Sequence, residues 1–267
     1  MSRTATKTHR RIAARLLAAA VLVVSAAACE PAPPGSNPVP TAGGTATTGA
    51  ASKPGHVFVI NLENKGYNKV WGAGSEAPYL SQTLRSQGVL LSKYYGIAHN
   101  SNPNYLAQIS GQASNAMTRA DCPTYAAFEL TGTGALGLAE GTGCVYPASV
   151  PTVAGQLSAA GKTWKGYMED MGTPCRHPEL GGQDTSQGAK VGDQYATRHN
   201  PFVYFQAITS SPDCQSNVVD FSELRGDLQS VATTPNLSYI SPNLCNDGHD
   251  NPCVDGSAGG LATADHW

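Results

Sequence analysis

Charged residues are scarce in this sequence, and neither sign dominates. They make up 13% of its 267 residues, and the formal net charge is −2 at pH 7. No stripe of Lys and Arg is present of the kind that nucleic-acid-binding proteins carry. The composition therefore argues against nucleic acid as a partner.

Other signals are missing as well. No apolar run is long enough to span a bilayer as a stable helix, and no segment has the pattern of an interfacial amphipathic helix. No two cysteines have the C-x-x-C spacing of many zinc sites, and no serine lies in a G-x-S-x-G elbow. No internal repeat is visible. These absences argue against a membrane span, a cysteine-ligated metal and an acyl hydrolase.

The first 29 residues have the layout of a secretory signal. A basic head containing Arg10 and Arg11 precedes an apolar run from Leu16 to Val24, and small residues stand directly before Cys29. Small residues before a cysteine are typical of lipoprotein processing, in which the Cys29 thiol takes a diacylglycerol. Ordinary cleavage at an Ala-x-Ala site, giving a secreted protein, is the alternative. We expect an exported chain that meets the membrane only through this N-terminal lipid.

Residues 30–54 consist mainly of Pro, Gly, Thr, Ala and Ser, with almost no large apolar side chain. Such a segment cannot bury enough surface to fold, so we predict a flexible tether. Residues 55–267 are long enough to bury a full core as one domain.

Seven cysteines are present, and assigning Cys29 to the lipid leaves an even number. Six cysteines in an exported domain suit an oxidising compartment and disulfide bonds. Neighbour pairing is the simplest connectivity, and buried free thiols are the alternative. The neighbouring pairs are Cys122–Cys144, Cys175–Cys214 and Cys245–Cys253.

Apolar periodicity predicts an α/β domain. Short β-branched runs indicate strands, and amphipathic or proline-started segments that end at glycine indicate helices. Their alternation predicts a mostly parallel sheet covered by helices on both faces. We expect strands at 56–62, 89–95, 163–168 and 236–240, helices at 77–87, 103–110, 151–160 and 220–231, and disulfide-tied loops at 111–151 and 175–199.

Polar side chains follow three of the expected strands. Glu63 and Asn64 follow the first, residues 99–104 the second, and residues 243–250 the strand that ends near Ile240. Ligands of open α/β sheets gather beyond the carboxyl ends of the strands. The oxygens of Glu63 and Asn64 suit a divalent cation, although a turn with an asparagine cap is the simpler interpretation of this pair alone.

Ser101 stands just before the helix expected to begin at Pro103. Free backbone amides and the positive end of a helix favour an anionic phosphate there, although serine is also a common helix cap. A serine hydroxyl becomes a good nucleophile only when a base or a metal lowers its pKa. His199 and His249 are further candidates, and His249 lies beside Asp247 in a glycine-bent loop. An isolated histidine is more often structural than catalytic.

Four blocks of residues together resemble the bacterial acid phosphatase and phospholipase C phosphoesterase family, which belongs to the alkaline phosphatase superfamily. The similarity runs from about His56 to the end, and the blocks occur in the order of the family. They are residues 57–64 (VFVINLEN), 101–107 (SNPNYLA), 199–202 (HNPF) and 242–250 (PNLCNDGHD).

The resemblance implies an alkaline-phosphatase-like fold that hydrolyses phosphate esters. It implies that Glu63 and Asn64 bind a catalytic divalent metal ion, and that Ser101 is the nucleophile that forms a phosphoserine. His249, and more loosely His199, would contact the phosphoryl oxygens or assist the leaving group. The substrate, a phosphomonoester or a phospholipid, the identity of the metal and the oligomeric state stay open.

One feature departs from the family. Its members carry a further strand that ends in an acidic pair and completes the metal site, whereas this sequence stops at Trp267, in the opening turn of an expected helix. We therefore expect a sheet without its last strand or strands, with Asp247, Asp250 or Asp265 as substitute ligands. Two rival functions follow: a surface-tethered binding protein or inactive remnant, and a serine acyl hydrolase that uses Ser101.

Overall fold

The structure is a computed structural model that describes residues 53–267. The predicted signal segment with Cys29, and nearly all of the predicted tether at 30–54, lie outside the described residues. No helix within residues 53–267 is both long and apolar enough to cross a membrane.

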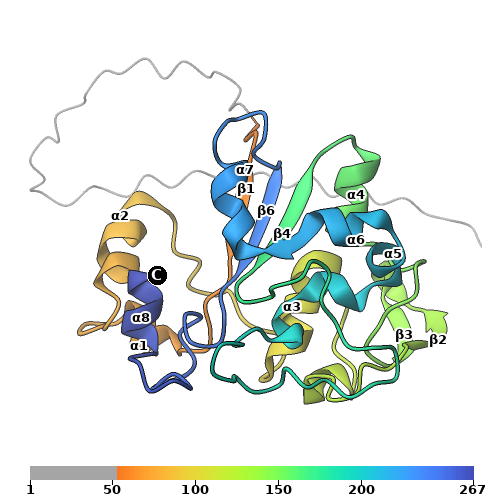
Figure 1. Cartoon of the computed structure of the whole chain (residues 1–267), viewed down its shortest axis with the longest axis horizontal. Helices are drawn as coiled ribbons and strands as arrows, with labels where there is room; N and C mark the ends of the chain where they lie inside the picture. Colours follow the sequence, from red (N-terminus) through yellow and green to blue (C-terminus); the bar gives the residue numbers. More distant parts are fainter. Residues whose placement is uncertain (1–52) are drawn as a thin grey trace, which may run out of the picture. The chain divides into compact units, whose positions relative to one another are not determined.

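A parallel four-stranded sheet forms the centre of the domain (Figure 1). Its strands are β1 (Val57–Ile60), β4 (Trp164–Met168), β5 (Val218–Asp220) and β6 (Leu237–Ser241). They stand in the order β1-β6-β4-β5, and every neighbouring pair is parallel. The predicted α/β class with a mostly parallel sheet is confirmed. A separate antiparallel hairpin joins β2 (Glu129–Thr133) and β3 (Ala139–Thr142).

Helices lie on both sides of this sheet. In Figure 1, α1, α2 and α8 lie to the left of the strands, and α3 to α6 lie to the right. The α-helices are α1 (Tyr67–Trp71), α2 (Arg85–Gln87), α3 (Ser101–Ser110), α4 (Val153–Ala159), α5 (Gln206–Thr209), α6 (Pro212–Asn217), α7 (Leu224–Asp227) and α8 (Leu261–His266). A π-helical turn at Tyr79–Leu84 precedes α2, and 3₁₀ turns lie at Thr118–Ala120, Ala135–Gly137, Thr197–His199, Pro201–Tyr204 and Phe221–Glu223.

The alternation along β4 shows how the two faces of the sheet are covered. Trp164 and Met168 belong to the larger core, which α3 and the aromatic turn at 201–204 complete. Tyr167 points to the other face and packs with Val219 and Ile240. Position 166, between Trp164 and Met168 on the strand, has room only for glycine. A Cβ there would lie 2.6 Å from the Phe202 ring. The sheet is therefore buried on both faces at β4, as a central parallel strand requires.

All three expected disulfide bonds are present. The structure pairs Cys122 with Cys144, Cys175 with Cys214 and Cys245 with Cys253, so neighbour pairing is confirmed. The alternative of buried free thiols is wrong for these six cysteines.

One secondary-structure prediction is wrong, and two are only partly confirmed. Residues 89–95 form no strand, and Val89 and Tyr95 are 86% and 76% exposed. The sheet order gives this segment no strand to pair with, so its β propensity is not realised. The helix predicted at 220–231 is shorter, since the 3₁₀ turn at Phe221–Glu223 and α7 together cover residues 221–227. The loop predicted at 111–151 contains the β2–β3 hairpin.

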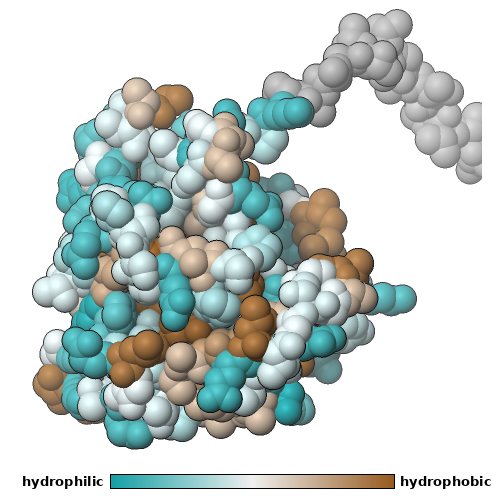
Figure 2. Space-filling model, turned by 90° about the vertical axis from the view of Figure 1, so that its right-hand side faces the viewer, coloured by the Kyte–Doolittle hydropathy of each residue, from teal (hydrophilic) through white to brown (hydrophobic). Residues whose placement is uncertain are grey.

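Exposed apolar surface is concentrated near β1 and the segment 89–97. Large apolar side chains at both places are between 45% and 86% exposed, and β1 is an edge strand of the sheet. The face shown in Figure 2 looks different, because its apolar patches are small and separated by hydrophilic side chains. Tyr94, Tyr95 and Ile97 of this exposed apolar surface line the cleft described next.

Candidate active site

The carboxyl ends of β1 and β6 bring the first two site residues together. Glu63 follows β1, and Asp247 lies in the loop after β6. Because the two strands are parallel neighbours, both side chains belong to the same edge of the sheet. The Glu63 N–H donates a hydrogen bond to the Asp247 carbonyl oxygen at 2.8 Å, which joins the two segments directly.

Ser101 is the first residue of α3, and its hydroxyl does not cap the helix. Its Oγ donates to Glu63 Oε1 at 2.9 Å. The first turn is capped instead by Asp121, whose Oδ1 accepts the Asn102 N–H at 2.8 Å. The simple N-cap interpretation of Ser101 therefore does not describe its contacts, and its hydroxyl is oriented by a carboxylate of the site.

His199 completes the group from a distant part of the chain. It ends the 3₁₀ turn at 197–199 and is 2% exposed. Its ring stacks on Tyr105 of α3, with the ring centroids 4.8 Å apart and the planes 2° from parallel. Nε2 lies 2.8 Å from Glu63 Oε1, and Nδ1 lies 3.6 Å from Asp247 Oδ2. The histidine thus stands between the two carboxylates.

These three side chains fit a divalent metal ion. One ligand atom each from Glu63, His199 and Asp247 lie within 4.8 Å of one another. Among the described residues, both His199 ring nitrogens and Asp247 Oδ2 are buried and make no hydrogen bond of good geometry, despite the short Nε2–Oε1 distance. Buried polar atoms without partners are costly. An imidazole and two carboxylates are a donor set that divalent ions commonly bind.

The pKa values of the two carboxyl groups are shifted in opposite directions. Burial raises the pKa of Asp247 to about 8, and the nearby Glu63 and Asp250 carboxylates add to the effect against the opposing His249 N–H. Burial also raises the pKa of Glu63, but the close His199 ring and the Ser101 hydroxyl outweigh it and leave that pKa lowered. At neutral pH Glu63 is therefore ionised, whereas Asp247 retains its proton until a cation or higher pH removes it.

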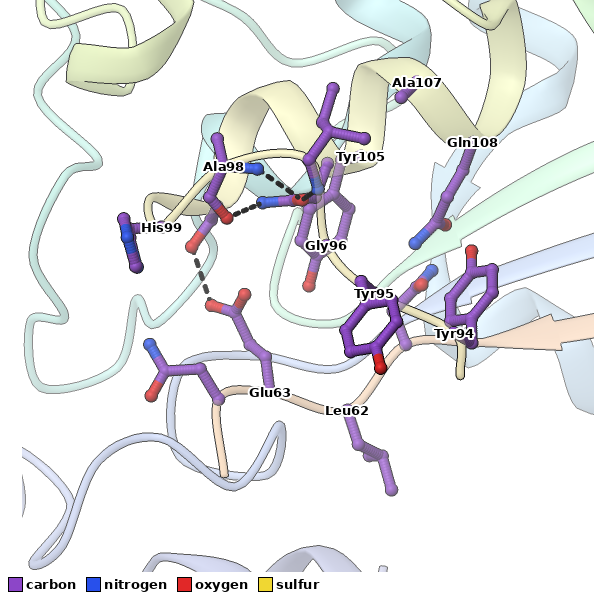
Figure 3. Close-up of a pocket in the computed structure, with 15 residues that line it drawn as sticks. Leu62, Glu63, Tyr94, Tyr95, Gly96, Ala98, His99, Tyr105, Ala107 and Gln108 are labelled. Atoms are coloured by element: carbon purple, nitrogen blue, oxygen red, sulfur yellow. Dashed lines mark hydrogen bonds between the residues drawn. The ribbon is translucent and has the colours of Figure 1, made fainter. Parts of the chain in front are cut away.

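A cleft opens beside this group. It has a volume of about 390 Å³ and is lined by Ser101, Glu63 and the segment 94–99. Figure 3 shows Glu63 reaching across it towards the start of α3, with the rings of Tyr94 and Tyr95 on one wall. A second hollow of about 670 Å³ shares Glu63 and Tyr94 with the first and is lined mainly by apolar side chains. The two hollows share lining residues, and Glu63 stands in the wall of both.

The structure places the other predicted site residues at different distances from this group. Asn64 is exposed and lines the cleft. The His249 side chain is 44% exposed, pairs with Asp250 Oδ1 at 2.7 Å and lines neither hollow. Asp265, considered above as a substitute ligand, accepts the N–H groups of residues 79 and 80 instead. Ser101, Glu63, His199 and Asp247 therefore meet. His249 contacts this group through its backbone N–H, which donates to Asp247 Oδ1, while its side chain pairs with Asp250 and Asp265 binds residues 79 and 80.

The structure brings to the site several residues that the sequence patterns did not predict as functional. Tyr105 supports His199, and the charge of Arg198 lowers the pKa of both Glu63 and Asp247. Glu169 and Asp170 directly follow β4. The strand-end rule applied to 163–168 would have identified this acidic pair, whereas no local signal marks Tyr105.

Comparisons with known proteins find phosphoesterases and phosphatases. A family model described as "Phosphoesterase family" matches residues 73–266, a range that includes Ser101, His199 and Asp247 but not Glu63. The chain is 28% identical over 204 residues to a probable acid phosphatase of Kluyveromyces lactis, covering 76% of this chain and 40% of that protein. It is 26% identical over 209 residues to an acid phosphatase of Aspergillus fumigatus, covering 75% and 41%.

A bacterial protein is similar to the same extent. The phosphatidylinositol-3-phosphatase of Mycobacterium tuberculosis is 27% identical over 203 residues, covering 76% of this chain and 54% of that protein. The chain thus spans about two fifths to one half of the length of these relatives.

Proposed function

The chain belongs to the phosphoesterase family, and from this premise we propose that it hydrolyses phosphate esters at the group formed by Ser101, Glu63, His199 and Asp247. The observation that carries the proposal is the 2.9 Å hydrogen bond from the Ser101 hydroxyl to Glu63, at the mouth of the cleft and beside two further potential ligands. A nucleophile, an orienting carboxylate and a cation-binding group then share one small site.

Ser101 is the proposed nucleophile. Glu63 holds its hydroxyl proton, which leaves a lone pair of Oγ free to face a phosphate in the cleft. Oγ would form a bond to phosphorus as the bond from phosphorus to the leaving oxygen breaks, and the leaving alcohol takes up the proton given by Ser101 through the solvent of the open cleft. Water would then cleave the bond between phosphorus and Oγ, releasing phosphate and regenerating the serine.

Glu63, His199 and Asp247 are the proposed metal ligands, with Asn64 close enough on the cleft wall to join them. A bound divalent ion would lower the pKa of the serine hydroxyl and neutralise charge on the phosphoryl oxygens. Within the protein, Tyr105 holds the plane of the His199 ring, and Arg198 contributes positive charge near both carboxylates. His249 stays a prediction as a donor to the phosphoryl group or the leaving oxygen.

Ser101→Ala tests the proposal directly. We expect p-nitrophenyl phosphate hydrolysis to fall by about 10³-fold or more, because the nucleophile is lost, while the melting temperature stays near that of the native protein. Ser110→Ala is a matched control, since Ser110 ends the same helix and donates only to the Leu106 carbonyl. In the native protein, acid quenching during turnover should leave a phosphoryl group on the peptide that contains Ser101.

The same assay separates the rival functions. Near-normal hydrolysis by Ser101→Ala would contradict the proposed nucleophile. Binding of a divalent ion without turnover of any phosphate ester would favour a tethered binding protein. A serine acyl hydrolase needs its serine to donate to a histidine, whereas Ser101 donates to Glu63. Hydrolysis of p-nitrophenyl acetate but not of the phosphate would nevertheless support that rival.

A phospholipid phosphate is the second candidate substrate. The second hollow, whose lining includes Glu63 and Asp247, also contains Tyr67, Trp71, Leu80 and Leu91 and has room for an apolar leaving group. The relative from Mycobacterium tuberculosis is named for a phosphoinositide substrate. Comparing kcat/KM for p-nitrophenyl phosphate and for a phosphatidylinositol phosphate in mixed micelles separates the two, since only the lipid should lose efficiency in Trp71→Ala.

We also propose that the protein is exported. Three disulfide bonds in the described domain support this, because such bonds persist in oxidising compartments. Anchoring through a lipid on Cys29 is the finer proposal. Metabolic labelling with a radioactive fatty acid, compared between the native protein and Cys29→Ala, tests it, and label retained by the variant would contradict the assignment.

A further inference from the structure

Two carboxylates extend from β4 towards the loop that carries Asp247. Glu169 continues the pairing of β4 with β6, since its N–H donates to the Ser241 carbonyl at 3.0 Å. Its side chain then crosses to the loop after β6. Oε2 accepts the Asn243 N–H at 2.9 Å, and Oε1 accepts the Asn246 side-chain amide at 2.8 Å. A single carboxylate therefore holds both the start and the middle of the loop.

Asp170 adds a third contact to the same loop. Its Oδ2 accepts from the Asn243 side-chain amide at 2.8 Å. The other end of that amide, Oδ1, accepts the N–H groups of Cys245 and Asn246 at 3.0 and 2.9 Å. The acidic pair thus fixes the orientation of the Asn243 side chain. That side chain in turn holds the backbone of residues 245 and 246.

The hydrogen bonds lead from this pair to the proposed metal site in two steps. The Asn243 carbonyl oxygen accepts the Asp247 N–H at 2.9 Å, and the Asp247 carbonyl oxygen accepts the Glu63 N–H at 2.8 Å. Asp247 itself is 0% exposed, and its Oδ2 makes no hydrogen bond within the described residues. Its other oxygen, Oδ1, accepts the His249 N–H of the same loop at 2.7 Å, so the fold of this loop decides whether the carboxyl group faces His199.

We propose that Glu169, assisted by Asp170, is a positioning residue that holds Asp247 against Glu63 and His199. Its kinetic consequence rests on the proposed function, whereas its effect on the loop does not. A carboxylate suits this role because it can accept on both oxygens, which glutamine of the same size cannot do. Outer partners of metal ligands commonly tune metal affinity in this way.

Glu169→Gln and Glu169→Ala are the test variants, and Asp227→Asn is the matched control. Asp227 accepts hydrogen bonds from Lys165 and Tyr167 of the same strand β4 but lies away from the loop. Hydrogen exchange followed by mass spectrometry should show residues 243–250 exchanging about tenfold faster or more in the Glu169 variants. The remainder of the domain and the control should exchange as in the native protein.

The functional readout is Mn²⁺ binding by calorimetry together with hydrolysis of p-nitrophenyl phosphate. We expect Glu169→Gln to bind Mn²⁺ about tenfold or more weakly and to show a lower kcat at limiting Mn²⁺, with KM nearly unchanged. Excess Mn²⁺ should restore kcat, because the variant loses metal affinity through the misplaced Asp247 ligand and a higher Mn²⁺ concentration fills the weakened site. A residue needed only for general stability would show no such rescue.

Each outcome decides the matter. Unchanged exchange at 243–250 in both Glu169 variants, or equal loss of Mn²⁺ binding in Asp227→Asn, overturns the proposal. If Glu169→Ala does not fold, Glu169→Gln supplies the comparison. If the native chain hydrolyses no phosphate ester, the proposed function fails, and hydrogen exchange alone decides whether Glu169 positions the loop.

Discussion

Replacing Asp247 by asparagine is expected to stabilise the ion-free protein at neutral pH. Asp247 is fully buried beside Glu63, and burial raises its pKa to about 8. An unfolded aspartate has a pKa near 3.8. Between these two values the folded state keeps a proton that the unfolded state has lost, so the unfolding free energy falls as the pH rises.

The size of this effect follows from the same pKa difference. Each pH unit within the window costs about 1.4 kcal/mol, so the native protein should lose about 4 kcal/mol between pH 5 and pH 8 from this group alone. The asparagine side chain of the variant does not titrate. The substitution therefore removes the contribution of residue 247 to the fall of the unfolding free energy with pH. Glu63 does not mask the effect, because its lowered pKa places its own stability change below pH 4.5.

Urea unfolding in EDTA, followed by tryptophan fluorescence at pH 5, 6, 7 and 8, measures how the unfolding free energy of the native protein and of Asp247→Asn changes with pH. Asp255→Asn is the control, since Asp255 is an exposed carboxylate farther along the chain. Equal pH slopes for Asp247→Asn and the native protein would refute the reasoning. Adding a divalent ion should stabilise the native protein and reverse its preference for low pH, because ligation favours the ionised carboxylate. The variant should gain much less.

Three further predictions concern the framework around the site. Removing the Cys122–Cys144 bond by serine substitution should cost about 3 kcal/mol, from the 22-residue separation that the bond closes, measured by urea unfolding. Gly166→Ala should destabilise the domain by about 1–3 kcal/mol and lower its melting temperature, because the new methyl group meets the Phe202 ring. Asp121→Ala removes the cap of the first turn of α3 and should cost about 1 kcal/mol, with a rise in hydrogen exchange at that turn.

Elements with strong local patterns could be predicted from the sequence. The apolar runs that became β1, β4 and β6 and the proline-containing segment of α3 carry their signals within a few residues. Parallel strands that are buried on both faces need such runs, so composition and position agree. The segment 89–95 has an equally strong pattern but no neighbouring strand among the described residues, and it is irregular. Local pattern therefore predicts the capacity to form a strand, whereas pairing decides whether one forms.

The candidate site divides in the same way. The sequence alone determined that Glu63 and the loop containing Asp247 follow strands, which placed them at one edge of the sheet, and that Ser101 lies at the start of a helix. The strand predicted before Ser101, at 89–95, does not form. Only the tertiary structure decided that His199 rather than His249 stands between the carboxylates, and that Glu169 reaches the Asp247 loop. The reason is physical: strand-end position depends on local periodicity, but the partner of a buried ring or carboxylate depends on packing between segments far apart in the chain.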